Sequence, residues 1–210
     1  MDTRERILKK TSEMFLTYGV RNVTMDLLAS DLGVSKRTLY ELFKDKDALV
    51  IECLRYMLIE DNKEVLKIIE ASENVIEAMF LITQRQEKRM QEFPKVFIED
   101  IKKYFPAVNE SFYSCQESLR EFSASYNLLE KGLWQEIFRK ELKIELVDAF
   151  IHELISLIHY SERLRLLSAE SNDILLSIFL PYFRGICTGK GLDLMEKYFS
   201  ERNENNTIQK

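Results

Sequence analysis

Residues 24–46 concentrate basic and hydroxyl side chains in a pattern suited to binding a nucleic acid. The segment reads TMDLLASDLGVSKRTLYELFKDK, and Lys36 and Arg37 are neighbours in it. Arginine can donate two hydrogen bonds to O6 and N7 of a guanine, and lysine can do the same or bind a phosphate. Serine, threonine and tyrosine hydroxyls are ordinary phosphate donors. The candidate DNA-contacting residues are Thr24, Ser35, Lys36, Arg37, Thr38, Tyr40, Lys44 and Lys46.

Two short helices must position these side chains. Thr24 is a good N-cap for a first helix that Gly33 ends after about two turns, and Ser35 is the N-cap of a second. Neither helix is long enough to be stable alone, so a third helix over residues 2–18, which ends at Gly19, must cover their apolar sides. This is the arrangement of a helix-turn-helix, in which the second of the paired helices enters the major groove of DNA.

The charge of the chain leaves this interpretation open. The whole chain has a formal net charge of −5, but residues 1–52 hold nine basic and nine acidic residues, and residues 33–46 hold four against two. A solvated basic face with Tyr40 packed against the protein would be the structural alternative. The coincidence of two short helices, a glycine turn and flanking basic residues favours DNA binding.

The same stretch resembles the tetracycline-repressor (TetR) family of transcription regulators. The resemblance covers about residues 4–50 and implies an all-helical homodimer, whose N-terminal module binds an operator and whose C-terminal domain binds an inducer and supplies the dimer interface. It places Arg37 at a base-facing position and Tyr40 and Lys46 at backbone-contacting positions. It is carried by LGVSKRTLY at residues 32–40, by Phe43, Lys44, Lys46 and Leu49, and upstream by Ile7, Leu8, Phe15, Gly19 and Thr24.

The composition indicates an all-α protein. Six glycines and three prolines are too few for the frequent turns of a sandwich or barrel, and 46% hydrophobic residues suffice for a core. We expect a helix-turn-helix domain over residues 1–60, with the paired helices at about 25–44, and a larger helical domain over residues 61–210. Periodicity predicts about nine helices in total. Beyond the first three they include 47–70, 73–89, 140–166 and 171–187, with starts near Pro94 and Pro106, an interruption at Gly132, a kink at Pro181 and a frayed tail over 201–210.

The second domain must supply the dimer contacts, because a dimer places two reading helices one turn of DNA apart. The most apolar segments, 140–166 and 171–187, are the candidates, unless both are buried within one subunit. The expected interface residues are Phe150, Leu154, Ile158, Ile178, Tyr182 and Ile186.

The resemblance also implies an effector cavity, for which aromatic content favours an apolar or flat compound. Aromatic residues at helical spacing are also ordinary core residues. The candidates are Phe80, Phe97, Phe112, Tyr113, Phe122, Tyr126 and Trp134.

Several other classes of protein are disfavoured. The longest uncharged stretch is ten residues, well short of a membrane span of roughly 20. The N-terminus MDTRERILKK lacks the apolar region of a signal peptide. The three widely spaced cysteines, Cys53, Cys115 and Cys187, indicate a reducing compartment, so we expect a cytoplasmic protein with thiols that are small buried apolar groups.

Neither a metal site nor a catalytic site is expected. His152 and His159 lie two turns apart on one helix, roughly 10.5 Å, too far for one zinc ion. HExxH, P-loop, GxGxxG and nucleophile-elbow patterns are absent. The sequence therefore predicts a DNA-binding transcription regulator without cofactor, specifically a repressor released from a palindromic or near-palindromic operator by a small molecule. The alternatives are a helical interaction module without DNA binding and, last, a helical enzyme.

Overall fold

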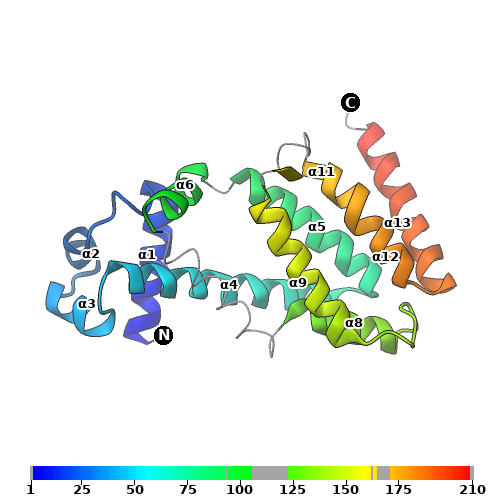
Figure 1. The fold of residues 1–210 in the computed structure, drawn as a ribbon, viewed down its shortest axis with the longest axis horizontal. Helices are drawn as coiled ribbons and strands as arrows, with labels where there is room; N and C mark the ends of the chain where they lie inside the picture. Colours follow the sequence, from blue (N-terminus) through cyan, green and yellow to red (C-terminus); the bar gives the residue numbers. More distant parts are fainter. Residues whose placement is uncertain (1, 93, 106–122, 162, 165–170, 209–210) are drawn as a thin grey trace. The chain divides into compact units, whose positions relative to one another are not determined.

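The computed structural model describes residues 2–92, 94–105, 123–161, 163–164 and 171–208, and helices dominate these ranges (Figure 1). Within them no strand forms, apart from one isolated antiparallel bridge between Phe138 and Cys187. The predicted all-α class is therefore confirmed. None of the described helices combines the length and hydropathy that crossing a membrane requires.

The chain divides into two compact units. The first comprises Met1–Glu64 with the described part of Arg89–Phe122, and the second comprises Val65–Lys88 with the described part of Ser123–Lys210. The expected boundary near residue 60 lies close to the division after Glu64. The segment after Arg89 differs from expectation, because its described helix belongs to the first unit.

Three local features of the sequence, two N-cap residues and one glycine, determine where the short helices of the first unit begin and end. Helix α1 spans Thr3–Tyr18, α2 spans Met25–Leu32 and α3 spans Lys36–Leu42, close to the predicted ranges. Thr24 and Ser35 cap α2 and α3 through their side chains, as predicted. Gly33 ends α2 with a φ of 65°, in the left-handed region where glycine avoids the strain of a Cβ.

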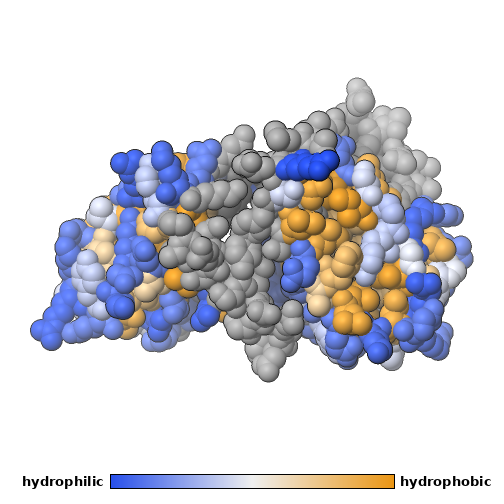
Figure 2. All heavy atoms as spheres, viewed as in Figure 1, coloured by the Kyte–Doolittle hydropathy of each residue, from blue (hydrophilic) through white to orange (hydrophobic). Residues whose placement is uncertain are grey.

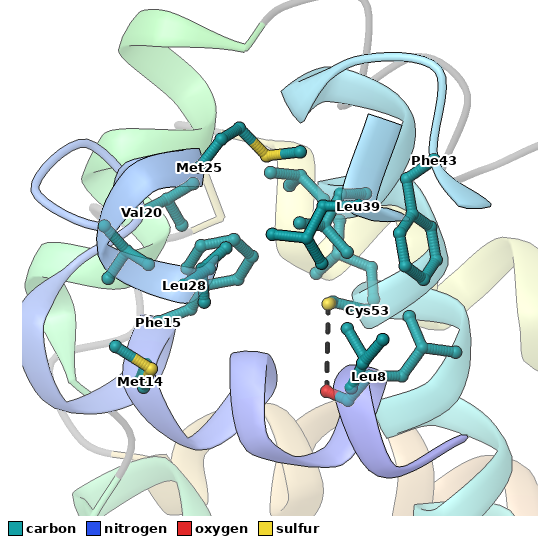
Figure 3. Close-up of a cluster of buried hydrophobic side chains, with 14 of the residues drawn as sticks. Leu8, Met14, Phe15, Val20, Met25, Leu28, Leu39, Phe43 and Cys53 are labelled. Carbon is teal, nitrogen blue, oxygen red and sulfur yellow. Dashed lines mark hydrogen bonds between the residues drawn. The ribbon is translucent and has the colours of Figure 1, made fainter. Parts of the chain in front are cut away.

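The apolar faces of these helices meet in one core. Phe15 of α1, Leu28 of α2 and Leu39 of α3 converge and are fully buried, as is Leu49 near the start of α4 (Lys46–Ala71) (Figure 3). Burying each such side chain contributes about 1.5–3 kcal/mol. Cys53 lies in the same core, and burial raises the pKa of its thiol to about 12, which keeps it unreactive.

Helix α6 (Lys95–Tyr104), which follows α5 (Val75–Glu92), completes the first unit from a distant part of the sequence. Phe97 is buried in the core of α1–α3, and Oδ2 of Asp100 accepts from the backbone N of Arg21 at 2.9 Å. The Arg21 guanidinium lies over the ring of Tyr104, 4.8 Å from its centroid. A Cβ at Gly19, where φ is 79°, would lie 2.8 Å from Asp100 Oδ2, so glycine permits this close approach.

The second unit packs its helices around a separate core, in which Ile76, Leu129, Ile137 and Phe138 are almost fully buried. Its Cys187 thiol is also buried, and burial raises its pKa to about 11. Besides parts of α4 and α5, it contains α8 (Ala124–Trp134), α9 (Ile144–Tyr160), α11 (Ser171–Ile174), the π-helical turn η2 (Leu175–Phe179), α12 (Leu180–Ile186) and α13 (Gly189–Ile208).

Three predictions of local structure change here. The kink expected at Pro181 takes the form of the π-helical turn that directly precedes α12, in whose first turn Pro181 stands. The tail expected to fray from residue 201 continues as helix α13 to Ile208. Gly132 does not interrupt a helix but lies inside α8. The predicted start at Pro106 and Cys115 lie outside the described residues.

Gly191 allows α13 to approach the backbone closely, which yields a stability prediction. A Cβ there would lie 2.5 Å from the carbonyl oxygen of Ile137 and 3.0 Å from Cβ of Cys187. We expect Gly191→Ala to destabilise the second unit by about 1–3 kcal/mol, measured by urea unfolding followed by circular dichroism. The control is Gly189→Ala in the same helix, where a Cβ meets nothing within 4 Å. That change should be neutral or stabilising by up to about 1 kcal/mol, and equal losses in both variants would contradict this account.

Candidate nucleic-acid interface

Helix α3 has one face fixed in the core and one face open to solvent. Leu39 is fully buried, whereas Lys36, Arg37 and Tyr40 are exposed. The N-terminus of α3 is held by Ser35, whose Oγ accepts from the backbone N of Thr38 at 3.0 Å and lies 2.7 Å from its Oγ1. The buried face therefore dictates which side chains α3 presents outward.

The basic side chains at the start of α3 have different partners. Nε of Arg37 donates to Oε1 of Glu41 at 2.7 Å, one turn further along the helix. Nζ of Lys36 lies 2.7 Å and 2.9 Å from the two carboxylate oxygens of Asp26, which stands in the first turn of α2. The hydrogen bond to Asp26 raises the pKa of the Lys36 ammonium, so it stays charged at neutral pH.

The remaining candidates lie at the starts of α2 and α4. Thr24 is exposed and accepts from the backbone N of Leu27 at 3.1 Å, and Lys44 is exposed before α4. Lys46 differs, because its Nζ donates to the carbonyl oxygen of Arg21 at 3.3 Å and lies 5.5 Å from the ring centroid of Phe105. Burial lowers the pKa of Lys46. All eight predicted side chains belong to the first unit, and Lys46 is the basic one whose ammonium lies against a backbone carbonyl and an aromatic ring.

Sequence reasoning missed the two carboxylates of this surface. The spacing of Arg37 and Glu41 is four residues, which places two side chains one above the other on a helix and was available as a signal. The pair of Asp26 and Lys36 spans the turn between α2 and α3, and helical periodicity does not predict contacts across a turn.

The aromatic residues proposed for an effector pocket do not gather at one cavity in the described part of the chain. Phe97 packs in the core of the first unit, which corrects its assignment to the second. Phe80 stacks on Tyr198 with ring centroids 5.6 Å apart. Trp134 is 82% exposed and lines an open groove of about 620 Å³ with α4 residues such as Leu66 and Ile69. Tyr126 is half-buried, and Phe112, Tyr113 and Phe122 lie outside the described residues.

The residues proposed for the dimer interface fall into three groups. Phe150 is exposed and its ring lies 4.8 Å from that of the half-buried Tyr182, and Ile178 is also half-buried. Leu154 and Ile186 are buried within the protomer, which leaves them little surface for a partner. The side chain of Ile158 lies outside the described ones.

Other exposed apolar residues lie on the same helices as the residues proposed for the dimer interface. Figure 2 shows apolar side chains gathered over α9 and α12. The exposed large ones on α9 and η2 are Leu146, Phe150, Leu157 and Leu176.

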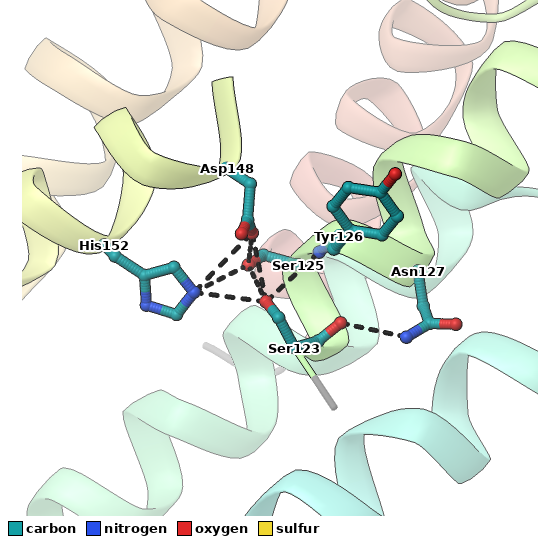
Figure 4. A network of polar contacts seen from close by, with 6 residues as sticks. All are labelled: Ser123, Ser125, Tyr126, Asn127, Asp148 and His152. Carbon is teal, nitrogen blue, oxygen red and sulfur yellow. Dashed lines mark hydrogen bonds and ion pairs between the residues drawn. The ribbon is translucent and has the colours of Figure 1, made fainter. Parts of the chain in front are cut away.

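A polar network joins α8 to α9 around His152 (Figure 4). The buried Asp148 carboxylate accepts from Oγ of Ser123 at 3.0 Å and from Oγ of Ser125. Nε2 of His152 lies 3.1 Å and 3.2 Å from these two hydroxyl oxygens and 3.5 Å from Asp148. A nucleophilic triad requires the carboxylate and the serine on opposite nitrogens of the imidazole, whereas here both face Nε2. The network therefore caps α8 and fastens it to α9.

Possible metal ligands, the side chains of His, Cys, Asp and Glu, occur throughout the described ranges 2–92, 94–105, 123–161, 163–164 and 171–208. Within those ranges no three His, Cys, Asp or Glu side chains come together in a way that could hold a metal ion. The side chain of His159 lies outside the described ones.

Comparisons with known proteins agree with this geometry. Residues 7–53 match the family model described as bacterial regulatory proteins, tetR family. The uncharacterized HTH-type transcriptional regulator YhgD of Bacillus subtilis (strain 168) is 30% identical over 129 residues, 60% of this chain and 67% of the relative. YerO, another uncharacterized HTH-type regulator of that strain, is 28% identical over 191 residues, 72% of this chain but only 63% of the relative. The crystal structure of reduced E. coli NemR shares the fold, with a TM-score of 0.59 and 14% identity, over 90% of this chain and 98% of that one.

Proposed function

Since the chain belongs to the tetR family of bacterial regulatory proteins and is a helix-turn-helix transcription regulator, we propose that it is a repressor whose helix α3 reads a palindromic operator. One observation carries the proposal. Leu39 locks α3 into the core, so that Arg37 and Lys36 stand at its exposed N-terminal end. Residues at this end of the second helix reach base edges when a helix-turn-helix docks in the major groove.

The neighbouring hydroxyl and ammonium groups suit contacts to the DNA backbone. Tyr40 projects from the exposed side of α3, and Lys44 follows it toward α4. Thr24 stands at the N-terminus of α2, where exposed backbone N–H groups favour a phosphate. We propose that these residues bind phosphates and that Arg37 contacts a base.

We propose that the second unit forms the dimer and binds an effector. The apolar surface over α9 and α12 is suited to a four-helix contact with a second copy of the chain. The open groove at Trp134 has the volume of a small-molecule site. We propose that an apolar or flat effector bound in the second unit releases the protein from DNA. We propose that the protein acts in the cytoplasm, where it has access to chromosomal DNA. Its relatives are transcription regulators, and we propose no catalytic activity for it.

Replacing Arg37 tests the assignment of α3. We expect Arg37→Ala to weaken operator binding by about 1–3 kcal/mol, or about 5- to 150-fold, and to relax base preference at one position. Gel-shift measurements at fixed salt, with duplexes from upstream of the protein's own gene and with random duplexes, check this. Binding should also fall steeply as salt is added, through release of counterions.

The matched control is Arg139→Ala, which removes a half-exposed arginine of the second unit and should leave binding unchanged. An equal loss on operator and random duplexes would show that Arg37 holds a phosphate instead. Wild-type protein that shifts no duplex would contradict DNA binding and favour a helical interaction module.

A further inference from the structure

The Arg37 side chain is 87% exposed, yet one contact fixes its orientation. Its Nε donates to Oε1 of Glu41 at 2.7 Å. Neither terminal nitrogen, Nη1 nor Nη2, has a hydrogen-bond partner among the residues that the structure describes. The guanidinium is therefore held at its inner edge and open at its outer edge.

The open edge is the one that can recognise guanine. Nη1 and Nη2 form a rigid planar fork whose two N–H bonds match O6 and N7 of that base. A mobile arginine must lose rotamer freedom to take up this orientation, whereas one already held by a neighbour loses less. A carboxylate at Nε therefore favours end-on reading of a base.

The carboxylate of Glu41 also disfavours sequence-independent binding to DNA. Glu41 is itself exposed on α3 and carries a negative charge. When α3 approaches DNA, that charge repels phosphates of any sequence, and this reduces the sequence-independent part of the affinity. Specificity is a difference between two affinities, so holding Arg37 and repelling phosphates act in the same direction.

The neighbouring Lys36 shows that the arrangement is particular to Arg37. Both carboxylate oxygens of Asp26 face Nζ of Lys36, across the turn between α2 and α3. An ammonium is a compact point charge without a planar fork, so this contact ties the two helices together and does not orient a reading edge.

We propose that Glu41 is a positioning residue that sets sequence specificity, by holding Arg37 for end-on recognition of a guanine. The inference rests on the proposed function, because it requires α3 to lie in the major groove. Glu41 need not touch the DNA, since it acts through Arg37. The inference also predicts that the base pair read by Arg37 is G·C.

The test is selection from a library of randomised duplexes by the full-length protein, followed by sequencing of the bound fraction. The position at which Arg37→Ala loses its preference identifies the base pair that Arg37 reads. Glu41→Ala should lower the guanine preference at that position by about 2- to 5-fold, leave other positions unchanged and raise binding to random duplexes. Glu41→Gln should restore part of the preference, since its amide oxygen can still accept from Nε.

The control is Glu60→Ala, which removes the carboxylate of an exposed pair with Lys63 on α4 and should change neither preference nor affinity. If Glu41→Ala keeps the full guanine preference and binds every duplex more tightly by the same factor, the inference is overturned. Glu41 would then act only through its negative charge. Loss of preference at every position would also overturn it, because Glu41 would then maintain the shape of the module. A wild-type protein without any preferred sequence would instead contradict the proposed function.

Discussion

Phe150→Asp is expected to separate the proposed dimer into monomers and to weaken operator binding by about 100- to 10,000-fold, because two linked modules gain affinity that neither has alone. Phe150 is 46% exposed on α9, within the apolar surface that also includes Leu146 and Leu157. An aspartate there would lose its hydration on association without gaining a partner, which disfavours the dimer. Sedimentation measurements give the mass, and binding to a duplex with both half-sites gives the affinity.

A duplex with a single half-site separates this effect from damage to the DNA-binding surface. The monomeric variant should bind a single half-site as the wild-type protein does. Leu81→Asp is the control, because Leu81 is a comparably exposed leucine on α5, a helix that contributes none of the residues named for the interface, and the variant should remain dimeric. A Phe150→Asp variant that sediments as a dimer would place the interface elsewhere.

The helix-turn-helix could be predicted from sequence because its signals are local. Thr24 and Ser35 are N-caps that act within three residues, and Gly33 ends a helix through its own backbone conformation. The outward face of α3 follows from the period of Leu39 and its buried neighbours. None of these inferences requires knowledge of a distant segment.

The place of α6 could not be predicted in this way. Its periodicity indicates an apolar face but not which core that face joins, and Phe97 was therefore assigned to the wrong unit. The contact that fixes it is the hydrogen bond between Asp100 and the backbone of Arg21, 79 residues away. Lys46 shows the same limit, since the sequence does not reveal that its half-buried ammonium contacts the carbonyl oxygen of Arg21 and the ring of Phe105. Its contact with DNA stays a prediction.

The interpretation of Gly132 as a helix interruption was wrong for a related reason. Glycine is a poor helix former, so local propensity predicts a break. In the structure, a Cβ at Gly132 would overlap the ring of Phe138, which is fully buried against α8. Tertiary packing thus requires glycine inside the helix, and a contact between residues in different elements cannot be read from local propensity.

Removal of the Phe15 side chain should have the largest effect on stability. Phe15 lies at the centre of the first unit, with 0% exposure, against residues of α2 (Figure 3). We expect Phe15→Ala to destabilise this unit by about 3–5 kcal/mol through lost burial and the cavity left behind. Operator binding should weaken with it, because α2 and α3 are too short to persist without the core.

The two units have separate cores, so a single unfolding curve can combine two transitions. Amide hydrogen exchange resolves them, and Phe15→Ala should accelerate exchange in α1–α3 while leaving α8 and α9 protected. Tyr18→Ala is the control, since Tyr18 lies on the same helix but is 57% exposed, and its loss should change stability by less than about 0.5 kcal/mol. If Phe15→Ala exchanged like the control, the packing of α1 against α2 would not be what presents α3 to DNA.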